Sequence, residues 1–359
     1  YRLGSLGFLA HPELDGSQGV NYALMDMIAA LQWVETNIAA FGGNPDRVTI
    51  TGVSAGGMSV DLLMVAEKSR DLISGAIAHS GYGTWPRQPR TTDVTPIANA
   101  PSAEAMGLEL VGRASGKPDD DVTHDDLYAL TPEQLVEAVN GFHLPIVDGI
   151  SLPEESGILF ALGRQHPIPY MSGGTSFDGS IWPLSGVTRE EVLGMTAGRA
   201  DRMRALYAAD FEVSEDQGIS RFFGDLRYVY AAWNMTRSME RVSRPGYLYM
   251  YEYVPPDRRG SVPGAGHGAG FDTLWGQPDL PIAATMRGYW MNFVKTGDPN
   301  GDGLTPWPPN VGPGSARWLV FDDSVTQKDG IHAAKMAFVD ELWTARVESL
   351  ISSSPGGVR

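Results

Sequence analysis

The sequence predicts an α/β protein with a mostly parallel central sheet and helices on both of its faces. Short apolar segments with strand character alternate with segments of helical periodicity, an alternation that is typical of parallel sheets. One strand also runs directly into the pentapeptide Gly52-Val53-Ser54-Ala55-Gly56 and then into a helix. That order is expected when a serine is held on a tight strand-to-helix turn.

The first predicted helix spans residues 20–41. Its apolar residues recur at spacings of three and four and so share one helix face: Leu24, Ile28, Leu31, Val34 and Ile38. Two glycines at 42 and 43 end it. The turn "NPDR" then leads into a strand over residues 48–51, and after the pentapeptide a second helix is expected to about residue 68.

Three further strands are predicted over residues 73–81, 169–180 and 245–254. The second and third strands of the predicted sheet are separated by residues 90–165. This segment is rich in Asp, Glu and Pro and contains short helical patterns, one of them with a helix cap at Thr131. We therefore expect a single domain over residues 1–359, with 90–165 as a helical insertion over the sheet.

The composition excludes several functional classes. With 43 acidic and 27 basic residues the formal charge is −16, which disfavours nucleic acid as a partner because binding to it depends on Lys and Arg neutralising phosphates. The chain has no Cys, so disulfides and thiolate nucleophiles are excluded. No stretch is apolar enough to predict a membrane span. The sequence leaves the cellular compartment and the oligomeric state open.

Ser54 allows two interpretations, because the glycines around it are equally compatible with an ordinary turn. The alternative is a nucleophilic serine, which needs a base to take its proton and an acid to orient that base. His267 lies among glycines in "PGAGHGAGF", after the last strongly β segment, and Asp178 follows a strand in "GGTSFDGS". The chain order serine, acid, histidine favours catalysis by Ser54, Asp178 and His267. Asp272, close to His267 in sequence, is the alternative acid.

The other six histidines lie at strand ends, in an acidic run or beside apolar segments, where structural roles are usual. A second candidate site is "DPNGDG", residues 298–303, which resembles the opening of a calcium-binding loop. Its twelfth position is Pro309, where such a loop needs a bidentate Glu. We therefore expect neither a metal site nor an organic cofactor.

Several long segments, in matching order from Tyr1 to about Pro308, resemble the type-B carboxylesterase family, the esterase, lipase and cholinesterase group of α/β-hydrolases. The segments are "YRLGSLGFLAHPE", "GVNYALMDMIAALQWVETNIAAFGGNPDRVTITGVSAGGMSV", "SRDLISGAIAHSG", "LPIVDGISLPE", "GAGHGAGF" and "YWMNFVKTGDPNGDGLTPWP". The resemblance implies the α/β-hydrolase fold. It also implies Ser54 as nucleophile, Asp178 as the triad acid, His267 as general base and the Ala55 amide as an oxyanion donor.

The implied activity is hydrolysis of small-molecule carboxylic esters through an acyl-enzyme, without metal or cofactor. Two alternatives remain: a specialised esterase, such as a lipase, a feruloyl-type or a toxin-ester hydrolase, and a catalytically inactive adhesion or binding relative. Pocket shape decides the ester preference, and Trp85, Trp182, Phe222 and Phe223 could be either pocket-lining or core aromatic residues.

The sequence departs from the family pattern at three places. Val53 stands where the family usually has Glu, and Asp178 stands where the triad acid is usually Glu. The family's glycine-rich oxyanion loop, His-Gly-Gly, lies upstream of the segment "YRLG". We therefore expect the functional molecule to include residues upstream of Tyr1.

Overall fold

The computed structural model describes residues 1–94, 101–312 and 316–353. The chain divides into two compact units. Unit 1 comprises Tyr1–Pro45, Val65–Leu72 and Pro86–Glu155, and unit 2 comprises Asp46–Met64, Ile73–Trp85 and Ser156–Arg359. The predicted insertion over residues 90–165 stays a prediction, as does the single domain.

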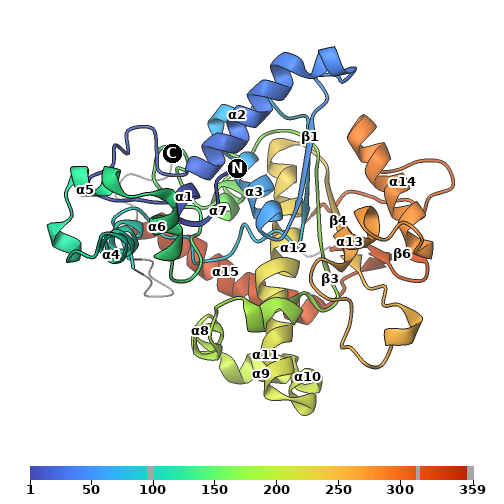
Figure 1. The fold of residues 1–359 in the computed structure, drawn as a ribbon. Helices are drawn as coiled ribbons and strands as arrows, with labels where there is room; N and C mark the ends of the chain where they lie inside the picture. The colour runs from blue at the N-terminus through green and yellow to red at the C-terminus, as the bar shows by residue number, and fades with distance from the viewer. Residues whose placement is uncertain (95–100, 313–315, 354–359) are drawn as a thin grey trace. The chain divides into compact units, whose positions relative to one another are not determined.

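Unit 2 contains a six-stranded sheet in the order β1-β2-β3-β4-β5-β6 (Figure 1). Its strands are β1 (Thr49–Val53), β2 (Gly75–His79), β3 (Tyr170–Thr175), β4 (Gly246–Tyr251), β5 (Arg317–Phe321) and β6 (Val325–Asp329). The first five are parallel, and only β6 runs antiparallel to its neighbour. This confirms the predicted mostly parallel sheet.

Helices cover both faces of this sheet. Tyr170 on β3 and Gly246 on β4 are register partners, so these two positions lie on the same face of the sheet. On that face the Tyr170 hydroxyl donates to Asp61, and the close neighbours are α3 (Ala55–Leu63), α7 (Ser156–Ala161) and α12 (Tyr230–Ser238). The opposite face, which includes Tyr247, packs on α13 (Ala269–Trp275) and α14 (Pro281–Thr296) in an aromatic core.

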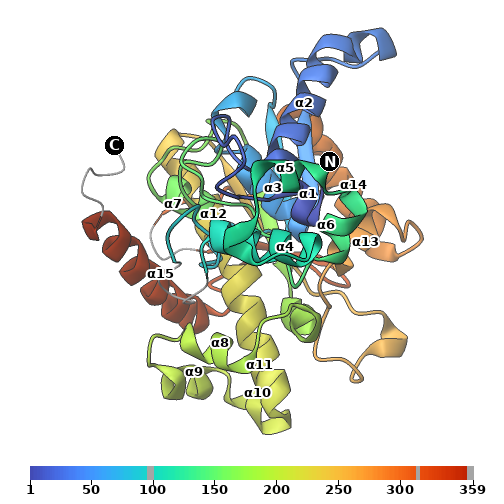
Figure 2. The same ribbon diagram turned by 60° about the vertical axis from the view of Figure 1, so that its left-hand side comes forward.

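Helix α12 continues a longer helical column. It follows α11 (Glu215–Gly224) and a π-helical turn, η5 (Asp225–Val229), without interruption. Three short helices gather around α11 in both views (Figures 1 and 2): α8 (Arg189–Gly194), α9 (Ala200–Leu206) and α10 (Ala208–Val213). The C-terminal helix α15 (Ala333–Ser353) contacts this column, with Asp340 accepting hydrogen bonds from Tyr230 and Arg237.

Unit 1 is helical. Its elements are α1 (Gly4–Gly7), α2 (Tyr22–Asn37), η1 (Ile38–Phe41), η2 (Glu67–Ser69), α4 (Ala103–Ser115), η3 (Asp119–Asp121), α5 (His124–Ala129) and α6 (Pro132–Glu137). Thr131 caps α6 as predicted, because its hydroxyl accepts from the Gln134 N–H. Together α2 and η1 match the helix predicted over residues 20–41.

Two expectations about local structure were wrong. The helix after the pentapeptide does not reach residue 68: α3 ends at Leu63, and Ala66 is extended, with φ −74° and ψ 121°. The segment 169–180 is a strand only to Thr175, after which the 3₁₀ turn η4 (Asp178–Leu184) begins. The remaining short turns are η6 (Met239–Val242) and η7 (Pro256–Arg258). No helix within the described ranges is both long and apolar enough to cross a membrane.

Candidate active site

Ser54 occupies the sharp turn between β1 and α3. Its backbone has φ 57° and ψ −116°, a combination that costs a non-glycine residue about 1–3 kcal/mol. The turn is so tight that a Cβ atom on Gly52 would lie 2.4 Å from the Gly56 backbone carbonyl. The Ser54 N–H donates to the His79 carbonyl oxygen at 2.9 Å, which ties the turn to β2. Strain of this kind, held by surrounding structure, is typical of functional sites.

Strand register brings the ends of three strands to one edge of the sheet. Val53 pairs with His79, and His79 pairs with Gly173. The residues that follow these strands, which include Ser54 and Ser80, therefore leave the sheet at its carboxyl edge, where ligands bind in open α/β sheets.

Asp178 is the first residue of η4 and is buried. One carboxylate oxygen, Oδ2, accepts hydrogen bonds from the Ser80 hydroxyl at 2.9 Å and from the Thr175 N–H at 2.7 Å. The other, Oδ1, lies 2.6 Å from Nδ1 of His267. These three partners fix the rotation of the carboxylate and leave Oδ1 for the histidine.

His267 is held from both its backbone and its ring. Its N–H donates to the Ser180 hydroxyl at 2.8 Å, and its ring packs on Tyr228 with a centroid distance of 4.6 Å. Because a carboxylate can only accept, Nδ1 of the ring carries a proton, and in the neutral ring this leaves the lone pair on Nε2. Nε2 is buried and has no hydrogen-bond partner among the described residues. A histidine in this state can act as a general base.

Two glycines allow η4 to lie directly on α11. A Cβ atom on Gly179 would be 1.5 Å from the Ser220 carbonyl oxygen, and one on Gly224 would be 2.2 Å from the Gly179 nitrogen. Gly179 immediately follows Asp178, so this backbone contact sets the position of the carboxylate.

The structure thus brings Asp178 and His267 together, and Ser54 leaves the same sheet edge. No hydrogen bond joins Ser54 to His267 in the part of the chain described; such bonds commonly tighten only when substrate is bound. Ala55 is the first residue of α3, so its N–H has no acceptor within the helix. Asp272 lies exposed on α13, and among the described residues it makes no hydrogen bond or ion pair with the His267 ring.

The sequence-based prediction did not include the supporting residues Ser80, Ser180 and Tyr228. Ser80 has φ 46°, a left-handed conformation that is uncommon outside glycine. The segment "HSG" after a buried strand is a signal that could have singled it out. Ser180 and Tyr228 depend on contacts between distant segments, which no local pattern reveals.

Two other residues considered in the sequence analysis, His79 and Asp298, have structural roles. His79 is buried between Tyr249 and Trp290, accepting from the indole N–H at 3.3 Å, and burial lowers its pKa to about 3. In the calcium-like segment, Asp298 accepts from the backbone N–H of Asn300 at 2.9 Å and so closes a turn. Within the described ranges no cluster of three His, Asp or Glu side chains could hold a metal.

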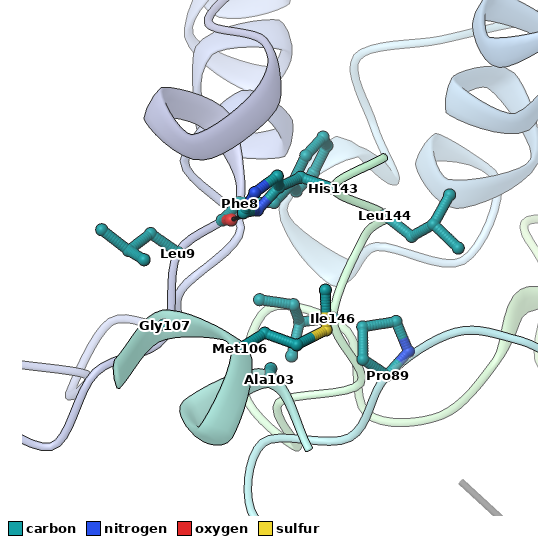
Figure 3. A pocket seen from close by; sticks show the side chains of 9 residues that line it. All are labelled: Phe8, Leu9, Pro89, Ala103, Met106, Gly107, His143, Leu144 and Ile146. Carbon is teal, nitrogen blue, oxygen red and sulfur yellow. Dashed lines mark hydrogen bonds between the residues drawn. The ribbon is translucent and has the colours of Figure 1, made fainter. Parts of the chain in front are cut away.

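Unit 1 contains a separate small cavity (Figure 3). Apolar side chains line most of it, among them Phe8, Met106 and Ile146, and His143 donates from Nδ1 to the Phe8 carbonyl oxygen at 3.1 Å. Its volume of about 10 Å³ is barely enough for one water molecule. This cavity is therefore too small to be a substrate site.

The fold and the arrangement at the sheet edge are those of an α/β-hydrolase. The chain belongs to the carboxylesterase family, whose family model matches residues 1–339. This confirms the predicted family and fold.

Similar proteins include the acylcarnitine hydrolase of Mus musculus, 28% identical over 98% of the chain, and the cocaine esterase of Homo sapiens, 30% identical over 86% of it. The chain covers 67% and 60% of these relatives, respectively, and so spans about two-thirds of their length. Among solved structures, a PNB esterase matches with a TM-score of 0.76 and 25% identity, over 94% of this chain and 73% of that one. Family and relatives support carboxylic-ester hydrolysis.

Proposed function

We propose that this protein hydrolyses carboxylic esters through an acyl-enzyme intermediate on Ser54. The observation that supports this most is the state of His267: Nδ1 is paired with the buried Asp178 carboxylate at 2.6 Å, and Nε2 is left without a partner. An imidazole so oriented serves as the base for a neighbouring hydroxyl nucleophile. The strained turn at Ser54 supplies such a hydroxyl at the same sheet edge.

In the first half-reaction, Nε2 of His267 takes the proton of the Ser54 hydroxyl as its oxygen attacks the ester carbonyl carbon. The developing imidazolium is stabilised by the Asp178 carboxylate, which stays ionised. The Ala55 N–H, at the N-terminus of α3, is placed to donate to the oxyanion. His267 then returns its proton to the leaving alcohol, and the acyl group remains on Ser54.

In the second half-reaction a water molecule attacks the acyl-enzyme. His267 takes a proton from the water and passes it to the Ser54 oxygen as the carboxylic acid leaves, which regenerates the free enzyme. Every proton transfer uses the same nitrogen, so no metal or organic cofactor is needed. The substrate class is small-molecule esters, in keeping with relatives named acylcarnitine hydrolase and cocaine esterase.

An inactive adhesion or binding relative is the competing proposal. Ser54, Asp178 and His267 are all present, and the buried contacts of Asp178 orient it toward the histidine. A binding protein would have no need of this arrangement, so we favour the enzyme.

The test is covalent labelling with a fluorophosphonate probe, followed by mass spectrometry of the labelled peptide. We expect one adduct on Ser54, none in the Ser54→Ala variant, and hydrolysis of p-nitrophenyl acetate lost by several orders of magnitude in that variant. Ser59→Ala is the matched control, because Ser59 lies on the same helix and its hydroxyl donates to the Ala55 carbonyl oxygen at 2.9 Å. Label on the Ser54→Ala variant would contradict the proposal.

A further inference from the structure

Arg227 lies among four aromatic rings in unit 2. Its guanidinium carbon is 4.3 Å from the ring centroid of Tyr82, 4.8 Å from Trp85, 5.4 Å from Tyr228 and 5.5 Å from Phe223. The residue is only 9% exposed. Stacking on π faces partly offsets the loss of water around such a cation.

No acidic group within the described ranges pairs with this cation. Nε of Arg227 is buried without a hydrogen-bond partner, and no ion pair or hydrogen bond within the described ranges involves the side chain. Unlike Nε, the two terminal nitrogens of the guanidinium are not buried, so a ligand can reach them. By contrast, Arg221 pairs with Asp210 at 3.1 Å and Arg237 pairs with Asp340 at 2.7 Å. Buried charges in proteins are normally paired, so Arg227 lacks the anion that its environment calls for.

The arginine is connected to the proposed catalytic residues through Tyr228. It lies in the π-helical turn η5, directly before Tyr228, whose ring packs on His267 at 4.6 Å. Tyr82 lies two residues after Ser80, whose hydroxyl donates to Asp178. The ring centroids of Tyr82 and Tyr228 are 5.8 Å apart. π-Helical turns are rare and frequently occur at functional sites. A group bound by Arg227 would therefore lie beside the reacting ester.

We propose that Arg227 binds a carboxylate on the substrate, so that the protein prefers esters with a second, anionic group, such as half-esters of dicarboxylic acids. A guanidinium presents paired N–H donors in a planar fork that matches a carboxylate. The net charge of −16 repels anions in general, so a local cation is needed to hold one at this edge. This inference rests on the proposed esterase function for its link to turnover.

The competing explanation is that Arg227 only packs against the aromatic rings. In that case removing it would affect all substrates alike, through stability or ring positions. Carboxylate binding predicts instead an effect that depends on the charge of the substrate.

The experiment compares mono-p-nitrophenyl glutarate with its neutral methyl ester, which has the same chain length. We expect wild-type protein to have the higher kcat/KM for the anionic ester. In Arg227→Met that value should fall about 10- to 100-fold, mainly through KM, while the neutral ester stays within about threefold. Arg227→Lys should retain part of the preference. Arg237→Met is the matched control, since Arg237 also stacks on a ring, Trp233 at 4.0 Å, and should leave the ratio unchanged.

Binding of monomethyl glutarate, itself a half-ester, is measured by calorimetry in the Ser54→Ala background and so reads the carboxylate contact without turnover. Ser54→Ala should bind it, and the variant that also carries Arg227→Met should bind it at least tenfold more weakly, with a cooperative melt retained. Failure to hydrolyse either ester would refute the esterase proposal alone, because the calorimetric result still decides the role of Arg227. An equal loss on both esters, an unchanged ratio, or unchanged binding in Arg227→Met would overturn the inference.

Discussion

Replacing Asp178 by Asn tests whether this carboxylate sets the tautomer of His267. The Thr175 N–H can only donate, and it lies 2.7 Å from Oδ2. In the variant the amide oxygen must therefore occupy the Oδ2 position, where the Ser80 hydroxyl also donates at 2.9 Å. The amide NH₂ group then faces Nδ1 of His267, at the site of the present 2.6 Å contact.

The consequence is a histidine with its proton on the wrong nitrogen. An NH₂ group can only donate, so Nδ1 must accept, and the ring proton moves to Nε2. Nε2 is the atom that has to take the Ser54 proton, so the base is lost although every hydrogen bond around Asp178 is preserved. The same change of tautomer in a serine protease lowers kcat by roughly 10⁴-fold, which corresponds to about 5.5 kcal/mol of transition-state stabilisation.

The assay is steady-state hydrolysis of p-nitrophenyl acetate, with a thermal melt to confirm that the variant stays folded. Asp272→Asn is the matched control, because that carboxylate is exposed on the neighbouring helix α13. We expect its kcat to stay within a few-fold of wild type. A folded Asp178→Asn variant with near wild-type kcat would refute the assignment, and an equal loss in Asp272→Asn would move the role to that residue.

Two further predictions concern the support of the site. Gly179→Ala should lower the free energy of unfolding by about 1–3 kcal/mol and reduce kcat, because the added Cβ would lie 1.5 Å from the Ser220 carbonyl oxygen. Gly194→Ala is the control: its Cβ would have no neighbour within 4 Å, so neither quantity should change. Burial raises the pKa of Asp61 to about 7. Between about pH 4 and pH 7 the folded state therefore keeps a proton on this carboxyl that the unfolded state has lost. The stability that this protonation contributes is lost as the pH rises through 7. Urea denaturation at pH 5 and pH 8 should show wild type losing about 2.7 kcal/mol relative to Asp61→Asn, and parallel pH profiles would contradict it.

The fold could be predicted from the sequence where periodicity and glycines mark the elements. The helix over residues 20–41 and the strands of β1 to β4 follow from apolar spacing. Strands β5 and β6 were not predicted. For β6 the reason is that it is a polar edge strand whose residues 326–329 are exposed. An edge strand needs no apolar face, so it leaves no alternating pattern to detect.

Some residues of the candidate site could likewise be predicted from the sequence, and others could not. Ser54 and His267 stand among glycines and are visible locally, and Asp178 follows from its place after a strand. The partners that give Asp178 its orientation come from strand register: Ser80 reaches it because β2 lies next to β3. Arg227 was not singled out at all, since nothing in "FGDLRYVY" indicates a π-helical turn or the four rings from separate segments that surround the side chain.

The environment of Arg227 has a thermodynamic consequence. Burying an unpaired cation costs several kcal/mol, and the four ring contacts, at about 0.5–2 kcal/mol each, offset much of that cost without supplying an anion. An anion that pairs with Arg227 removes this cost, and it binds the folded state alone. At a hundred times its dissociation constant such a ligand would stabilise the fold by about 2.7 kcal/mol. Monomethyl glutarate should therefore raise the melting temperature of the Ser54→Ala variant and not that of the variant that carries both Ser54→Ala and Arg227→Met.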